Sequence, residues 1–464
     1  MTEYIKQIFE YFRNLALNSA GVERTLYELL EQNDISGVIE LMQNHDDEVE
    51  EALKEYNPQT HDVMNRPNKS RKNAKEYETE KLPRSRQRYI NEVELFFLLG
   101  SPIKWELTEG DEEAYSLFTE FLQEQRFDSL MRKAKRLAGA ETESAKLYHI
   151  YRNDNTNERA VKALVLARST GYKLRPLFDQ YGNLSAFAYG YKLKEQGKTI
   201  QHWDIQTADS LYYCKKGAIG WEVEQFPNPT GKINIVYYRQ PKAWSGAERR
   251  LNREEMLDSK VGDTNNYFAD PIAVATGDVI DSMTDPNRPG KLIQVIGHES
   301  KFEYLNPPQT SETRREEKSD LEKSILFDTF TPDLSFDNLK GLGTLSGSAI
   351  KNAMILGFIK RDNLKEIYEE MLDREKNIII GILKYLYPNK AVAFDEMKIK
   401  HEFTEPFAVD RQSNINQIAQ LYQVGLLSRE SAISNIGIVD NANEEAQRIV
   451  KQSQILDNTQ SVEE

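Results

Sequence analysis

A proline and two glycines between two long helical patterns constrain this chain more than any other feature of its sequence. Residues 311–330 form a charged, helix-forming run, and Pro332 ends that run because proline lacks a helix donor. Gly341 and Gly343 follow, and both can adopt the positive φ angles that other residues avoid. A pattern of apolar residues at three- and four-residue spacing then covers residues 345–386. The sequence therefore predicts two helices joined by a glycine-containing loop, which is more typical of a mechanical part than of a reaction centre.

The same glycines could indicate a nucleotide site. Gly341, Gly343 and Gly347 come near a dinucleotide-binding fingerprint, but that motif must follow a buried strand and open a helix. Here the preceding element is a predicted helix that ends at Pro332, and no Gly-Lys-Ser/Thr sequence follows. We therefore favour a loop and a helix cap over a phosphate site.

The charge balance argues against one class of function. The 464 residues, enough for two to four domains, include 60 Lys and Arg against 74 Asp and Glu, a net charge of −14. A protein that wraps nucleic acid neutralises phosphates with clustered cations, and this balance disfavours that mode of binding. It does not exclude a protein through which DNA moves without being held tightly.

The single cysteine, Cys214, cannot form an internal disulfide, and no signal peptide opens the chain, so a reducing compartment is expected. The longest apolar runs, 93–99 and 378–383, are too short to cross a membrane.

The first half of the chain predicts helices and then strands. Helices are expected at 1–56, 86–99 and 112–138, a strand at 103–107, and an antiparallel meander at 145–240. His149 and His202 fall in the strand patterns and are interpreted as structural. Between the first helices lies a polar segment, 57–86, which we interpret as a solvated arm or linker. Its basic residues could instead contact DNA or a partner: Lys69, Arg71, Lys72 and Lys75.

Two charged helices are predicted at 246–268 and 311–330, with short strands between them. A helix that is polar around most of its surface cannot hold itself in a monomer core and needs neighbours, for which salt-bridged copies of itself are suited. The sequence thus predicts a small β unit carried on two antiparallel stalk helices. The stalk residues expected to pair between subunits are Arg249, Arg250, Arg253, Glu254, Arg314, Arg315 and Glu316. The turn of the β unit contains Asp285, Asn287 and Arg288.

The last part of the chain predicts more helices. After the helix at 345–386, a strand pair is expected at 391–394 and 397–403. Helices follow at 415–422, 429–436, with Ser428 as N-cap, and 443–452, and residues 454–464 are expected to be disordered.

The sequence lacks the common catalytic and metal-binding motifs. No Cys/His set has zinc spacing, and neither His-Glu-x-x-His nor Gly-x-Ser-x-Gly occurs. The six histidines are scattered singly, and adjacent carboxylates fall on predicted solvated helix faces. We therefore predict no catalytic residue, no metal and no cofactor.

The order of these parts resembles the portal proteins of tailed bacteriophages, of the siphophage type, over residues 84–455. The similarity lies in a helix ending in Phe96-Phe97-Leu98-Leu99-Gly100-Ser101-Pro102-Ile103 and in Glu143-Ser144-Ala145-Lys146-Leu147-Tyr148. It continues in Asp263-Thr264-Asn265-Asn266-Tyr267-Phe268-Ala269-Asp270-Pro271 and in Pro332-Asp333-Leu334-Ser335. It ends with Leu345-Ser346-Gly347-Ser348-Ala349-Ile350-Lys351 and Leu427-Ser428-Arg429-Glu430-Ser431-Ala432-Ile433.

The resemblance implies an α+β portal-type fold. Its parts would be N-terminal helices and a polar arm of the outer wing (1–83), a wing (84–245), stem helix 1 (246–268), a clip (269–310), stem helix 2 (311–330), a tunnel loop (331–345), a long helix with wing return (346–410), and crown helices with a disordered tail (411–464).

The resemblance also implies a ring, typically of twelve subunits, at one capsid vertex of the virion, assembled in the host cytoplasm. Double-stranded DNA would pass through the ring, and the implied partners are the terminase large subunit, a head–tail adaptor, and the major capsid and scaffolding proteins, with no membrane. The channel would be lined by the tunnel-loop residues Ser335, Asn338, Lys340, Gly341, Gly343 and Thr344. The clip would bind a partner through Asp285, Asn287 and Arg288. Lys340, the loop's only cation, is either a phosphate contact or a solvated side chain. Two alternatives remain at this point: a phage-associated metal-dependent nuclease or hydrolase, and a monomeric scaffold module.

Overall fold

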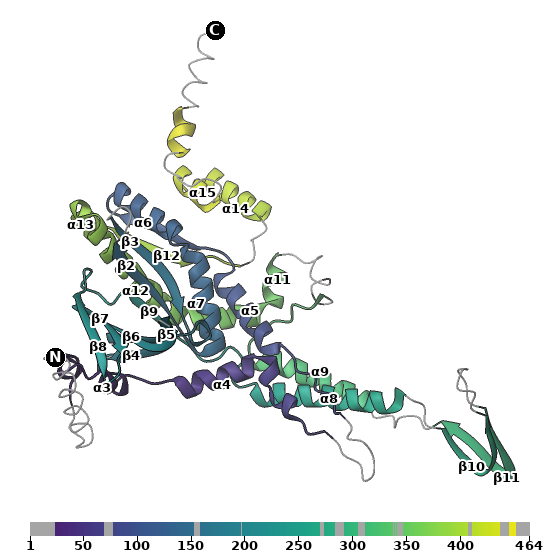
Figure 1. Cartoon of the computed structure of the whole chain (residues 1–464). Coiled ribbons are helices and arrows are strands. Elements are labelled where there is room, and N and C mark those ends of the chain that lie inside the picture. The colour runs from purple at the N-terminus through teal and green to yellow at the C-terminus, as the bar shows by residue number, and fades with distance from the viewer. Residues whose placement is uncertain are drawn as a thin grey trace, which may run out of the picture. The chain divides into compact units, whose positions relative to one another are not determined.

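The structure of the chain is a computed structural model with helices and antiparallel strands in two compact units (Figure 1). The first unit comprises residues 1–333 and 356–404, and the second comprises residues 334–355 and 405–464. Within these bounds the structure describes residues 24–68, 78–152, 158–195, 197–269, 273–283, 292–304, 311–336, 338, 340, 347–406, 411–436 and 445–451.

Short helices begin the described chain, as the sequence predicts. They are α2 (Leu26–Glu31), α3 (Ile35–Leu41), α4 (Asp46–Tyr56) and the 3-10 turns η1 (Pro58–Thr60) and η2 (Asp62–Asn65). Thr25 and Glu28 form a reciprocal capping box that fixes the start of α2. The first turn of α4 carries three acidic residues, where negative charge is favoured by the helix dipole. The predicted helices before residue 24 lie outside the described residues.

Helix α5 (Arg86–Leu99) has the bounds that the sequence predicts, and strand β1 (Ile103–Glu109) follows it. The single helix predicted at 112–138 is wrong. The structure has α6 (Glu112–Glu124) and α7 (Phe127–Glu141), separated by Arg126 in the left-handed region at φ 52°. With the helix broken at this point, both Phe121 and Phe127 are buried, so tertiary packing outweighs the continuous helical pattern.

The predicted meander separates into two antiparallel sheets. The first has the strand order β3-β2-β9, from Arg159–Leu166, Glu143–Arg152 and Ile235–Arg239. The second runs in sequence order through β4 (Lys173–Phe178), β5 (Leu184–Glu195), β6 (Lys198–Thr207), β7 (Ser210–Lys216) and β8 (Trp221–Pro227). Leu147, Phe187 and Tyr237 share one buried cluster, so the two sheets face each other across it. Tyr148 and Tyr238 belong to another cluster with α7 and the later helix α12, because successive strand residues point to opposite faces.

The two charged helices are present where the sequence predicts them. Helix α8 (Glu248–Ala269) and helix α9 (Ser311–Asp328) lie side by side (Figure 1). Between them in the sequence, β10 (Ala273–Met283) and β11 (Leu292–Tyr304) pair as one antiparallel hairpin with two irregularities of register. The several short strands predicted here are therefore two longer ones.

The long helix predicted at 345–386 is interrupted once. Helix α11 (Gly347–Ala353) and helix α12 (Ile355–Leu386) are separated at Met354, whose N–H lies 3.0 Å from the Ile350 carbonyl and 3.1 Å from that of Lys351. At Gly357, a Cβ would lie 2.4 Å from the Phe97 ring, so α12 approaches α5 there at a distance that only glycine allows.

The strand predicted at 391–394 is wrong, because these residues belong to helix α13 (Ala391–Glu396), which follows the turn η4 (Pro388–Lys390). A four-residue apolar run does not distinguish a strand from a helix, and Pro388 favours the start of a helical turn. The other predicted strand is β12 (Lys398–Phe403), and it pairs with β1.

The second unit contains helices α14 (Arg411–Gln423) and α15 (Arg429–Ile436), and residues 445–451 are also helical. The predicted cap is confirmed, since the Ser428 hydroxyl accepts a hydrogen bond from the backbone N–H of Ser431 at 3.1 Å. Lys351 and Glu405 form an ion pair of 2.6 Å within this unit. The tail predicted to be disordered, 454–464, lies outside the described residues.

Buried ion pairs attach α12 to the rest of the first unit. Glu94 of α5, only 3% exposed, pairs with Lys135 of α7 and, at 3.0 Å, with Lys360 of α12. Burial alone would raise the pKa of the Glu94 carboxyl, but the two ammonium groups lower it to about 2. Further along α12, Glu375 pairs with Lys146 of β2 at 2.7 Å, and both side chains are fully buried.

We predict that Glu94→Ala destabilises the fold by about 3–5 kcal/mol, because it leaves the Lys135 charge buried without its carboxylate. The matched control is Glu92→Ala on the same helix. Glu92 pairs with Arg136, both side chains are well exposed, and its loss should cost under about 1 kcal/mol. Denaturant unfolding of the two variants measures the difference, and equal losses would contradict this account.

Candidate functional site: the stem helices and the arm

Helix α8 carries a face of polar side chains that are buried. Glu255, Ser259 and Asp263 recur every four residues, Glu254 adjoins the first of them, and all four are at most 7% exposed. Isolated carboxylates cannot be buried without large cost, so partners must compensate them. These partners come from residues 78–86, which we call the arm.

The arm donates backbone hydrogen bonds to this face at regular intervals. The N–H of Glu80 reaches Asp263 at 2.7 Å, that of Leu82 reaches the Ser259 hydroxyl at 2.9 Å, and that of Arg84 reaches Glu255 at 2.8 Å. Each step of two arm residues corresponds to one step of four helix residues in the opposite direction. Two extended residues span about 6.7 Å and four helical residues about 6 Å, so an extended segment can follow one face of a helix over two turns.

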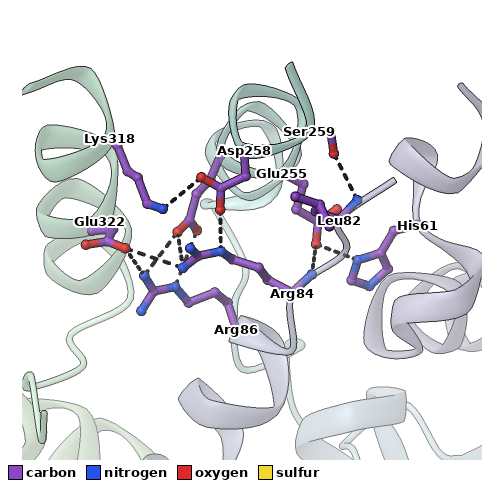
Figure 2. A network of polar contacts seen from close by, with 10 residues as sticks. His61, Leu82, Arg84, Arg86, Glu255, Asp258, Ser259, Lys318 and Glu322 are labelled. Atoms are coloured by element: carbon purple, nitrogen blue, oxygen red, sulfur yellow. Dashed lines mark hydrogen bonds and ion pairs between the residues drawn. The ribbon is translucent and has the colours of Figure 1, made fainter. Parts of the chain in front are cut away.

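Arginine side chains of the arm region join the two stem helices (Figure 2). Arg84 donates to Asp258 at 2.7 Å and lies 3.0 Å from Glu254, both on α8. Arg86 pairs with Glu254 at 3.0 Å and with Glu322 of α9 at 2.6 Å. The arm thus compensates the negative charges of carboxylates on both α8 and α9.

His61 completes the network from the other side of the arm (Figure 2). Its Nδ1 lies 2.7 Å from the Glu255 carboxylate, and its Nε2 lies 2.7 Å from the backbone carbonyl of Glu55. Both partners accept hydrogen bonds, so the geometry fits an imidazolium that donates from both nitrogens. Burial alone would lower the pKa of His61, but the Glu255 carboxylate outweighs burial and the pKa is raised.

Comparison with known proteins gives the family. A family model described as "Phage portal protein, SPP1 Gp6-like" matches residues 39–457, nearly the whole chain. The chain belongs to this portal protein family. Its members are structural rather than catalytic, which sets aside the alternative of a nuclease or hydrolase. A search of curated proteins finds no match.

Solved structures similar to this portal chain include "Neck of native GTA particle computed with C12 symmetry", at 11% identity and a TM-score of 0.40, over 76% of this chain and 91% of that one. "Virion of native gene transfer agent (GTA) particle" matches at 10% identity and a TM-score of 0.39, over 76% of this chain and 89% of that one.

Across the residues that the structure describes, no helix could span a membrane, and no group of three or more His, Cys, Asp or Glu could hold a metal ion.

The stem residues that the sequence predicts to pair between subunits divide into two groups. Four have partners within the chain: Glu254 pairs with the arm, Arg250 with Asp328, Arg253 with Glu317, and Arg314 lies 3.4 Å from the Thr264 hydroxyl. The others have exposed side chains, and they are Arg249, Arg315 and Glu316.

The predicted channel and clip residues are described only in part. Ser335, Asn338 and Lys340 have exposed side chains, and the backbone at 336, 338 and 340 is helical. Gly341, Gly343, Thr344, Asp285, Asn287 and Arg288 lie outside the described residues.

Sequence reasoning missed the arm–stem contact. It interpreted 57–86 as a solvated linker because the segment has few apolar residues, but Thr79 and His61 are both 4% exposed. The available signal was charge complementarity between two distant segments. Arg84 and Arg86 lie in the polar segment, and carboxylates recur along one face of the later helix α8.

The raised pKa of His61 predicts a pH dependence of stability. A raised pKa in the folded state contributes stability that is fully present below the unfolded pKa, about 6.5, and is lost as the pH rises through the folded value. The free energy of unfolding lost in His61→Gln should therefore be largest in mildly acidic solution and should shrink at alkaline pH.

His149 supplies a control of opposite sign, because burial lowers its pKa. Its contribution is lost as the pH falls, so the effect of His149→Gln should follow the reverse trend. Denaturant unfolding across pH measures both. An effect of His61→Gln that does not change with pH would contradict the imidazolium assignment.

Proposed function

We propose that this portal chain assembles into a ring, typically of twelve subunits, at one capsid vertex of a virion. In that ring double-stranded DNA passes through the centre during packaging and ejection. The observation that carries the proposal is the family match over residues 39–457. The two stem helices with a hairpin between them in the sequence support it.

The parts of the chain receive roles in this proposal. The hairpin β10–β11 is the clip, on which the terminase large subunit and later a head–tail adaptor dock. Residues 331–345 line the channel, where Lys340 is exposed and able to contact phosphate. Major capsid and scaffolding proteins surround the wing, and assembly takes place in the host cytoplasm. The net charge of −14 favours a channel that holds passing DNA weakly.

The exposed charges of the stem suggest how neighbouring subunits meet. The acidic groups of α8 pair with the arm, with α9, with His61 and with Lys242, and every exposed charged residue in its described part, 248–266, is basic. Two of these, Arg250 and Arg253, pair with α9 of the same subunit, so Arg249 and Lys260 are left to face a neighbour. Helix α9 carries exposed acidic residues one turn apart, which are Glu312, Glu316 and Asp320. A basic strip on one subunit and an acidic strip on the next give a head-to-tail contact that can close into a ring.

The pairing within one subunit sets the heights of these strips. Arg314 of α9 lies 3.4 Å from the Thr264 hydroxyl of α8, and Lys318 of α9 lies 2.8 Å from the Asp258 carboxylate of α8. The residues of each pair are therefore at the same height along the two helices. Lys260 therefore lies near the height of Glu316, and we expect these two residues to pair between subunits.

We predict that the double variant Arg249→Glu, Lys260→Glu shifts rings toward monomers. Each exposed pair contributes only about 0–1 kcal/mol, but the contact repeats at every interface of the ring. Adding Glu316→Lys should restore rings in part, because it forms the expected pair with residue 260 again with the two charges exchanged. Mass photometry at low salt measures the populations.

The control for this experiment is Arg250→Glu, which breaks the pair with Asp328 inside one subunit and should leave the ring population nearly unchanged. Unchanged rings in the first double variant would show that these strips are not the interface. Monomers in the wild-type protein under all conditions would count against the ring itself.

A further inference from the structure

A basic cavity lies at the C-terminal part of α12, away from the stem. Its volume is about 470 Å³. Its walls come from α12, α13, the loop between β8 and β9, and the first residue of β3. The charged residues that line this basic cavity are Arg159, Lys232, Lys384 and Asp395.

Within the described part of the chain, two of its three cations have no carboxylate partner. Lys384 pairs with Asp395 at 2.7 Å. Arg159 instead donates to the backbone carbonyl of Tyr385 at 2.6 Å and stacks 4.2 Å from the centre of its ring. Lys232 donates to the carbonyl of Asn377 at 2.9 Å. Among the residues that the structure describes, neither Arg159 nor Lys232 forms an ion pair with a carboxylate, although the chain carries fourteen excess negative charges.

The environment of Lys232 makes an additional anion favourable. Burial lowers the pKa of its ammonium group, and the charge of Lys384 lowers it further. An anion placed between these groups would relieve their mutual repulsion.

A glycine keeps the floor of the basic cavity open. Gly381 lies in the interior of α12, where glycine is unfavourable for a helix, and the Lys232 side chain crosses it. A Cβ at this position would lie 3.4 Å from Lys232 Cδ, an ordinary contact, so an alanine would fit. The absence of a side chain leaves room beside Lys232 within the cavity.

The surroundings of the cavity are apolar. Pro388 and Ala391 line it, and their neighbours Tyr387 and Val392 are 40% and 70% exposed. A concave site with cations inside and apolar side chains beside it suits a peptide that offers both a carboxylate and an apolar residue. Duplex DNA presents its phosphates on a convex surface, and the net charge of −14 disfavours the many phosphate contacts that such binding needs.

We propose that the basic cavity binds a carboxylate side chain from an acidic and apolar segment of a partner protein. The carboxylate accepts hydrogen bonds from Arg159 and Lys232, and an adjacent apolar residue packs against Tyr387 and Val392. This site is separate from the stem and from the clip, and it does not depend on the ring.

The test is fluorescence anisotropy with three labelled probes and the purified full-length protein. The first is a peptide that alternates glutamate with leucine, the second has glutamine in place of every glutamate, and the third is a short DNA duplex. The acidic peptide should bind at least roughly tenfold more tightly than the amide peptide, since charge-assisted hydrogen bonds are lost in the latter. Equal binding of the two peptides, or preferential binding of the duplex, would overturn the proposal.

Variants assign the binding to the cavity. Arg159→Gln with Lys232→Gln should weaken binding of the acidic peptide roughly tenfold or more. The matched control, Lys192→Gln with Lys194→Gln, removes the same charge from exposed positions on β5 and should change binding little. An equal loss of peptide affinity in both double variants would show that only the net charge of the protein attracts the peptide, and would contradict a specific site. If the double variant does not fold, Lys232→Met alone can replace it, because methionine keeps much of the length of the side chain. This variant should also weaken binding of the acidic peptide.

Discussion

The structure of the stem depends on how carboxylates on α8 are compensated. A helix with so few apolar residues gains little from the hydrophobic effect, and its buried acidic face would oppose folding if it had no partners. The arm supplies those partners as backbone N–H groups and as the guanidinium groups of Arg84 and Arg86, while His61 adds a third cation. Since Arg86 also reaches Glu322, the same contact holds α9 to α8. The buried acidic face of α8 is thereby satisfied inside one subunit, and the exposed charges of α8 are basic.

Buried charges have a similar role in the body of the first unit. Glu94 and Glu375 each meet lysines from other elements, so the position of α12 is specified by ion pairs as well as by apolar packing. Such pairs add little net stability compared with apolar residues of the same shape, but each is costly to break. They therefore favour one placement of α12 over alternatives that would leave a charge unpaired.

Sequence reasoning succeeded where local signals decide the structure. Helix α5 ends before Gly100 and Pro102, and α15 begins after the Ser428 cap, because caps and breakers act within a few residues. It failed where distant contacts decide. The helix breaks at Arg126, next to the buried Phe127, and no local breaker in the sequence indicates this. The stem helices were predicted from their charge, but the arm was not, because a polar segment reveals its partner only in three dimensions. For the same reason Glu254 was predicted at a subunit interface, although it pairs with the arm inside the chain.

The family assignment and the arm–stem contact together give one account: a portal subunit whose helix α8 is completed by its own arm, and whose exposed stem charges we propose to face a neighbour. Electron cryomicroscopy of the purified full-length protein tests this most directly. The account predicts annular particles with a central hole, in which residues 78–86 of each subunit lie along α8 of the same subunit. Particles without a hole, or an arm that lies on α8 of the neighbouring subunit, would contradict it.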